Sequence, residues 1–130
     1  MGSDYLTSPF DDLLKPVDNH LIVHNELMSS LILGNRIRIH TTEYGIPDLD
    51  SVKIALLGIP EERNSVDYLG DELNLNEIRK SFYNLYPGNW SSGISDLGNL
   101  ILGNSSEETY GRLISLLTIL FKKDIIPILI

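Results

Sequence analysis

The clearest hydrophobic pattern in the chain lies in its second half. Nearly continuous apolar runs occupy residues 52–59, 94–102 and 125–130, and Pro60 ends the first of them. Runs of this kind are typical of strands that are buried on both faces, as in a parallel sheet. The sequence therefore predicts three buried, parallel strands at these positions.

A helix is predicted between the first two strands, over residues 75–86. Asn74 is placed to act as its N-cap with Glu77 three residues later, and Pro87 with Gly88 stops it. A spacing of three to four residues predicts one apolar helix face that is formed by Leu75, Ile78, Phe82 and Leu85.

A second helix is predicted between the second and third strands. Ser105 is its expected N-cap, Glu108 occupies the third helical position, and Lys122 and Lys123 lie in the last turn, where positive charge suits the helix dipole. Its apolar side is predicted to contain Tyr110, Leu113, Ile114, Leu117 and Leu120, with Phe121 beside it. The alternation of strands and helices predicts an α/β fold with a mostly parallel sheet and helices on its faces.

The first half of the chain has weaker patterns. Residues 1–50 are predicted to form an N-terminal arm with short strands, and residues 51–130 a β-α-β-α-β unit. Within the arm, residues 21–23 are expected to form a short strand and residues 35–40, which alternate polar and apolar side chains, a half-buried strand. A short helix is expected at residues 25–33, ended by the glycine that follows.

Composition and charge indicate which kinds of partner the chain binds and in which compartment it lies. The net charge of −8 argues against nucleic acid and against an anionic membrane surface, because little here would neutralise phosphates. The absence of cysteine excludes disulfides, zinc–thiolate sites and cysteine nucleophiles. The sequence has neither a signal-peptide pattern nor an apolar run near the roughly 20 residues of a membrane helix. We therefore expect a soluble, cytoplasmic protein with no membrane partner.

Three side chains near the N-terminus form a candidate metal site: His20, His24 and Glu26. Two histidines four residues apart on a helix can share a metal ion. The intervening Leu-Ile-Val trio favours a strand, however, which would hold the imidazoles about 13 Å apart. Metal binding here is accordingly the minor hypothesis. His40, at the end of a predicted strand, is expected to be exposed.

A polar loop follows the first strand, where ligands bind in parallel sheets. Its candidate residues for the mouth of a substrate site are Glu61, Glu62, Arg63 and Asn64. Spacing alone favours the alternative of a solvated loop with a local Glu–Arg pair. Asp96 lies within a strand pattern, and because an unpaired buried charge is costly, we interpret it as a capping or hydrogen-bonding residue rather than a catalytic one.

Four segments in this order resemble the arginase, agmatinase and formimidoylglutamase family of ureohydrolases. They are VKIALLGIPEERN at 52–64, NEIRKSFYNL at 76–85, ISDLGNL at 94–100 and IPILI at 126–130. The last resembles the strand that precedes the family's Gly-Gly-x-His-Asp motif. The EERN and FYNLY stretches look closest to formimidoylglutamase-like members, and the resemblance covers residues 51–130.

The resemblance implies a three-layer α/β/α fold, of which this chain is expected to be an incomplete, N-terminal part. Complete members hold two manganese ions about 3.5–4 Å apart, which activate a water that attacks an amidine or guanidine carbon and breaks a C–N bond. The three ligand motifs of the family are expected only after Ile130, inside whose apolar run the chain stops. The resemblance therefore assigns no catalytic residue, metal ligand or cofactor to this chain alone, which is predicted to be inactive.

A second hypothesis is a small, non-catalytic α/β module for binding or self-association, so the sequence leaves open whether the chain is an enzyme. A sheet that is cut at its edge has unpaired strand groups and uncovered apolar surface. We therefore predict self-association in either case, and a small-molecule substrate only for the full-length protein.

Overall fold

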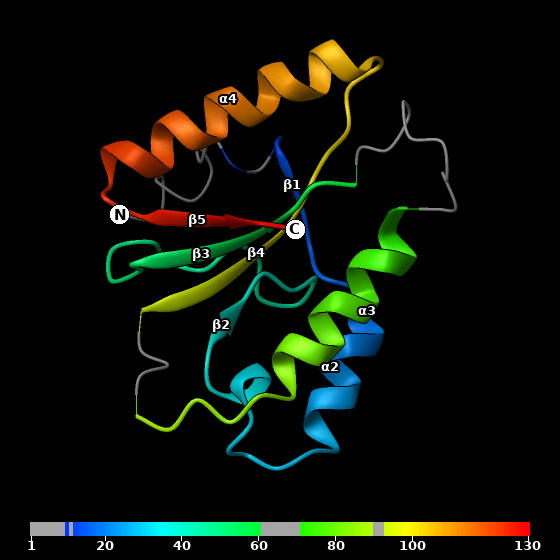
Figure 1. The fold of residues 1–130 in the computed structure, drawn as a ribbon, viewed down its shortest axis with the longest axis vertical. Coiled ribbons are helices and arrows are strands. Elements are labelled where there is room, and N and C mark those ends of the chain that lie inside the picture. The colour runs from blue at the N-terminus through cyan, green and yellow to red at the C-terminus, as the bar shows by residue number, and fades with distance from the viewer. Residues whose placement is uncertain (1–9, 11, 61–70, 90–92) are drawn as a thin grey trace.

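A computed structural model of the chain describes residues 10, 12–60, 71–89 and 93–130. This part contains three α-helices and five strands that form one mixed, mostly parallel sheet (Figure 1). The predicted α/β fold class is confirmed. None of the helices in these ranges is both long and apolar enough to cross a membrane.

The centre of the sheet is formed by the strands that the apolar runs predict. β3 (Ile54–Gly58) lies between β4 (Ile94–Leu100) and β5 (Ile126–Leu129) and pairs in parallel with both. Two short strands share the far edge of β4: β1 (Leu14–Lys15) is antiparallel to it, and β2 (Arg38–Ile39) is parallel. Of the strands in the described ranges, β1 is the antiparallel one, and it makes the sheet mixed.

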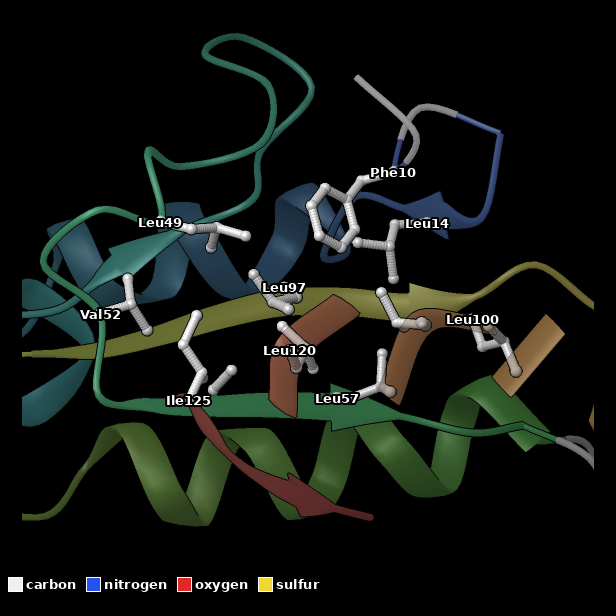
Figure 2. Packing of buried hydrophobic residues seen from close by; sticks show 11 residues of the cluster. Phe10, Leu14, Leu49, Val52, Leu57, Leu97, Leu100, Leu120 and Ile125 are labelled. Atoms are coloured by element: carbon white, nitrogen blue, oxygen red, sulfur yellow. The ribbon is translucent and has the colours of Figure 1, made fainter. Parts of the chain in front are cut away.

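Helices cover both faces of the sheet and give three layers (Figure 1). α4 (Ser106–Lys122) lies on one face, and α2 (Asn19–Glu26) and α3 (Asp71–Tyr83) lie on the other. The larger apolar core lies on the α4 side, as Figure 2 shows, and contains Phe10, Leu14, Leu49, Val52, Ala55, Leu57, Leu97, Leu100, Leu116, Leu120 and Ile125. A smaller cluster on the other side centres on Val17, Leu21 and Tyr83.

The α2 segment differs from the sequence prediction. The strand expected at residues 21–23 is wrong, because these residues form the middle of α2. Asp18 caps this helix by accepting a hydrogen bond from the backbone N–H of His20 at 2.9 Å. Leu21 and Asn25, one helical turn apart, face inward. The helix expected at residues 25–33 is also wrong, since that stretch begins with the end of α2 and otherwise contains no α-helix.

Other parts of the N-terminal half pack into the core and pair with the sheet. Phe10 and Leu14 are 5% and 3% exposed and belong to the larger core. The strand expected at residues 35–40 shrinks to the two residues of β2. His40 was expected to be exposed but is buried. Its Nδ1 lies 2.8 Å from the carbonyl oxygen of Leu97, and this hydrogen bond offsets the cost of burying the ring. The division of the chain near residue 50 stays a prediction.

The cap of α4 is confirmed, and its apolar face only in part. The Ser105 hydroxyl accepts a hydrogen bond from the backbone N–H of Glu108 at 3.2 Å. Leu120 is fully buried, but Tyr110 and Ile114 of the predicted face are half or more exposed. The buried stripe is rotated, because the helix packs through Leu116 and Leu120. β5 also differs from a buried strand, since most of its side chains are exposed at the edge of the sheet.

Candidate functional site

Helix α3 buries a polar face against the sheet. Its inward residues are Leu75, Arg79 and Tyr83, which are spaced four apart and therefore lie on one side of the helix. The apolar face expected from the sequence is wrong for Ile78 and Leu85, which are 46% and 56% exposed. The helix also begins before Asn74, so this residue is not its N-cap. Arg79 and Tyr83 are both 0% exposed, which requires partners within the fold.

The opposing strand β4 has a bulge that presents two polar side chains to α3. Between Leu56 and Gly58, β3 advances by two residues, while β4 advances by three, from Asp96 to Asn99. Residues three apart in a regular strand point to opposite faces, and the extra residue lets Asp96 and Asn99 point to the same one. Gly98 occupies the bulge with a φ of +89°, where a Cβ would lie 2.1 Å from the carbonyl oxygen of Lys15. Only glycine fits there.

Groups from this bulge accept four hydrogen bonds from the five N–H donors of the Arg79 guanidinium. Its Nε and Nη2 donate to the two carboxylate oxygens of Asp96 at 2.8 and 3.0 Å, a bidentate pair. Its Nη1 donates to Oδ1 of Asn99 at 2.6 Å, and Nη2 also donates to the carbonyl oxygen of Gly98 at 2.9 Å. Four hydrogen bonds thus join one side chain of α3 to β4.

Two further donors complete the coordination of the Asp96 carboxylate. The hydroxyl of Tyr83 donates to Oδ2, and the backbone N–H of Gly98 donates to Oδ1 at 2.9 Å. We call these five residues, Arg79, Tyr83, Asp96, Gly98 and Asn99, the Arg79 network. It reaches β3 as well, because a Cβ at Gly58 would lie 2.1 Å from Oδ1 of Asn99. A side chain at Gly58 would therefore displace the network.

The electrostatics of the network favour one protonation state. Burial, and then the negative charge of Asp96 and the hydrogen bond to it, raise the pKa of Tyr83 far above its ordinary value. For Arg79, burial acts to lower the pKa, but the attraction and hydrogen bonds of Asp96, with a smaller contribution from Tyr83, outweigh it, and the pKa is raised. The phenol stays neutral and the guanidinium charged at neutral pH, which is the pairing that the hydrogen bonds require.

The burial of this network limits what it does chemically. Arg79 and Asp96 are both 0% exposed, so a substrate does not reach either side chain. Their donors and acceptors are directed at one another, which is the arrangement that a buried charged pair needs to be tolerated. The interpretation of Asp96 as a hydrogen-bonding residue is confirmed. The network joins α3 to the sheet, and its role is structural.

The Arg79 network also connects two of the segments that resemble ureohydrolases. Arg79 and Tyr83 come from the Ile-Arg and Phe-Tyr steps, and Asp96 and Asn99 from the Asp-Leu-Gly-Asn strand. Comparisons with protein-family models, with curated proteins and with solved structures find no match. The resemblance to ureohydrolases therefore stays a prediction, whose physical support is the joint use of these residues.

The candidate substrate-mouth residues Glu61, Glu62, Arg63 and Asn64 lie outside the described residues. Gly58, which ends β3 shortly before them, lies at the carboxyl edge of the sheet. Their assignment to a substrate site stays a prediction.

The described residues do not fit a metal centre. His20 and His24 both lie on α2, so the distance argument against a shared ion does not hold. The side chain of His20 is nonetheless 97% exposed and lies beside Asp18, while Nε2 of His24 is buried. Across the described ranges, no three histidine, aspartate or glutamate side chains gather in a group that could hold a metal ion. Among the residues that the structure describes, none form a ligand set for the two manganese ions that the resemblance implies.

Proposed function

We propose that this chain is the N-terminal sheet portion of an arginase- or formimidoylglutamase-like hydrolase of amidine or guanidine substrates. In this proposal it contributes scaffold rather than catalytic groups. The observation that carries the proposal is the Arg79 network, because its members depend on one another. Arg79 needs Asp96 and Asn99 on one face, that arrangement needs the bulge at Gly98, and the close approach needs glycine at position 58.

This dependence explains physically why three of the resembling segments occur together in one chain. A glycine that ends a buried strand, an arginine on the next helix and an Asp-x-Gly-Asn bulge on the next strand are useful only together. Chance resemblance at separate places would not bring these residues into one hydrogen-bonded group. The co-occurrence supports kinship with a family that carries the same segments in the same order.

The position of the network suggests how a scaffold would serve catalysis. Gly58 and Asn99 are paired in register near the carboxyl ends of β3 and β4. In open parallel sheets, ligands bind beyond these ends. By joining α3 to β4 and packing against Gly58 of β3, the network would hold the strand ends from which the following loops depart. Preorganised loops position substrate more effectively than loops on a mobile base.

The edge strand β5 supports the incomplete sheet of the proposal. Ile126 and Ile128 are 63% and 43% exposed, and Leu129, which alternation places on the opposite face, is 44% exposed. A strand that is apolar on both faces is typical of the interior of a parallel sheet, and here these faces are open to solvent. We propose that further strands and helices of the same enzyme cover them and supply the metal ligands.

The gene and the isolated chain test this proposal together. We expect the reading frame to continue past Ile130 into a Gly-Gly-x-His-Asp segment and later His/Asp motifs. We also expect the 130-residue chain with added manganese to release no urea or formamide from arginine, agmatine or formimidoylglutamate. A stop codon after Ile130, or hydrolysis by the purified chain alone, would contradict the proposal.

A second candidate is a non-catalytic module that self-associates through a second copy, which the exposed edge of β5 favours. The backbone N–H groups of Ile126 and Ile130 donate to the carbonyl oxygens of Lys53 and Leu57 on β3. The backbone groups of the odd-numbered residues between them therefore point away from β3, toward the open edge. Pro127 has no N–H to offer there, and Leu129 supplies the outward donor. Concentration-independent monomers in light scattering would count against this candidate.

A further inference from the structure

Helix α4 has apolar side chains on two of its sides. Leu116 and Leu120 are fully buried against the sheet. A second row, which we call the α4 stripe, consists of Tyr110, Ile114, Leu117 and Phe121. Tyr110, Ile114 and Phe121 are 50%, 65% and 59% exposed, while Leu117 is partly buried and packs against the core. A helix that is apolar on more than one side is typical of a helix that is covered on more than one side.

The spacing of the α4 stripe suits packing against another helix. Its members lie four, three and four residues apart, which is the alternation of the two apolar positions in a heptad repeat. At 3.6 residues per turn they form one narrow row along the helix. This spacing is the same when it is read from either end. Two copies of α4 can therefore pack antiparallel about a twofold axis, with Tyr110 against Phe121 of the second copy and Ile114 against its Leu117.

Charges at the two ends of α4 favour the antiparallel arrangement. Glu107 precedes Ile114 by seven residues and so lies on the side of the stripe, and Lys122 lies in the last turn, next to the end of the stripe. Across the described ranges, neither residue forms an ion pair within its own copy. Antiparallel packing brings Glu107 of each copy near Lys122 of the other, whereas parallel packing would bring like charges together. Lys123 and Asp124, which follow, are opposite in charge and leave this balance unchanged.

The residues that flank the α4 stripe allow a second helix to approach closely. Gly111 and Thr118 are small and exposed, and a Cβ added at Gly111 would meet no atom within 4 Å. Small side chains at a helix contact permit a short distance between the helix axes. The Thr118 hydroxyl donates to the carbonyl oxygen of Ile114 at 2.8 Å, so covering it would leave no unpaired donor.

We propose that the α4 stripe is the interface of a homodimer in which α4 of one copy packs antiparallel against α4 of a second copy. The apolar row supplies the affinity, and the Glu107–Lys122 pairs at both ends select the orientation. The stripe is much smaller than the roughly 20–30 residues per side of a standard interface, so the dimer is weak. It involves neither the edge strand β5 nor the Arg79 network, and it does not depend on the ureohydrolase proposal.

Sedimentation velocity of the 130-residue chain from micromolar to millimolar concentration tests this interface. We expect a monomer–dimer equilibrium. Ile114→Lys should raise its dissociation constant at least about tenfold, because the substitution places a charge in the apolar row twice per dimer. Leu27→Lys is the matched control, at an 80% exposed residue that follows α2 on the other face of the sheet, and it should dimerise as the parent does. Each added lysine makes a chain of net charge −8 less negative, so overall repulsion cannot explain weaker association.

A charge reversal tests the orientation of the two helices. At low ionic strength, Glu107→Lys and Lys122→Glu should each weaken dimerisation about threefold or more, because each brings like charges together at both ends of the interface. The double variant should dimerise within about twofold of the parent, because the pairs form again with their signs exchanged. Both reversals oppose the dipole of α4, so this recovery cannot come from a more stable helix.

Urea denaturation followed by circular dichroism shows that each variant is folded before its association is measured. The proposal is overturned if the parent sediments as a monomer throughout, which would leave the α4 stripe to a different occupant such as a further helix of the same enzyme. It is also overturned if Ile114→Lys associates like Leu27→Lys, as pairing through β5 alone would give, or if the double charge reversal associates no better than either single reversal.

Discussion

Arg79→Met tests the physical basis of the fold most directly. The substitution keeps much of the volume and apolar stem of the side chain but removes the guanidinium, whose four hydrogen bonds reach Asp96, Gly98 and Asn99. The Asp96 carboxylate then stays buried with only Tyr83 and the Gly98 N–H as donors. Removing one partner of a buried ion pair costs about 3–5 kcal/mol, since the remaining charge is uncompensated.

This loss is large compared with the whole stability of a small domain, which is about 5–15 kcal/mol. Urea denaturation followed by far-ultraviolet circular dichroism measures it as a shift of the midpoint at constant slope. Arg112→Met is the control at a partly exposed arginine, whose Nη1 donates to the carbonyl oxygens of Ile101 and Leu102 at 3.1 and 3.3 Å. Its ion pair with Glu108 is of the i,i+4 type, with side chains 30% and 43% exposed, and no buried charge is left behind, so we expect a loss of about 1–2 kcal/mol.

A double-mutant cycle with Asp96→Leu decides whether the pair acts as a unit. Each single variant leaves one buried charge behind, whereas the double variant leaves none. We therefore expect the double variant to lose at least about 2 kcal/mol less than the sum of the single losses. Additivity within about 0.5 kcal/mol, or an Arg79→Met loss no larger than that of Arg112→Met, would refute the reasoning.

Three further predictions concern the bulge, the phenol and the edge strand. Gly98→Ala should cost at least about 2 kcal/mol in urea denaturation, because alanine is strained at a φ of +89° and its Cβ would meet the Lys15 carbonyl oxygen. Stability should fall by up to about 1.4 kcal/mol per pH unit above the ordinary tyrosine pKa of 10.0, because the raised pKa of Tyr83 leaves only the unfolded chain to lose this proton. Denaturation at several alkaline pH values should show a shallower decline for Tyr83→Phe than for the parent. Ile128→Lys should lower the apparent mass in concentration-dependent light scattering, because a charge at the exposed edge opposes pairing; an unchanged mass would argue against association through β5.

The sequence predicts most reliably the elements whose determinants are local. β3 and β4 follow from continuous apolar runs, and the start of α4 follows from the Ser105 and Glu108 capping pair. α2 escapes prediction because its Leu-Ile-Val trio favours a strand, while its cap at Asp18 and its buried Leu21 favour a helix. Tertiary packing decides between the two, and no local window contains that information.

The polar core escapes prediction for a related reason. A periodicity argument counts apolar residues, and it therefore assigns the inward face of α3 to Ile78 and Leu85 rather than to Arg79 and Tyr83. Asp96 offsets the cost of burying Arg79, but it lies on another element, β4, whose bulge brings Asp96 and Asn99 to the same face. The only sequence feature that joined these positions was the resemblance of their segments to one family.

Strand β4 carries two buried polar residues in succession, and the contrast between them argues for different roles. Asp96 faces α3 and receives hydrogen bonds from Arg79, Tyr83 and the Gly98 N–H. Ser95 faces the other way, and its buried hydroxyl has no hydrogen-bond partner. A buried carboxylate whose partners are all internal stabilises the folded state, whereas a buried hydroxyl without a partner costs free energy. In urea denaturation, Asp96→Leu should therefore lower the free energy of unfolding, whereas Ser95→Ala should leave it equal or raise it.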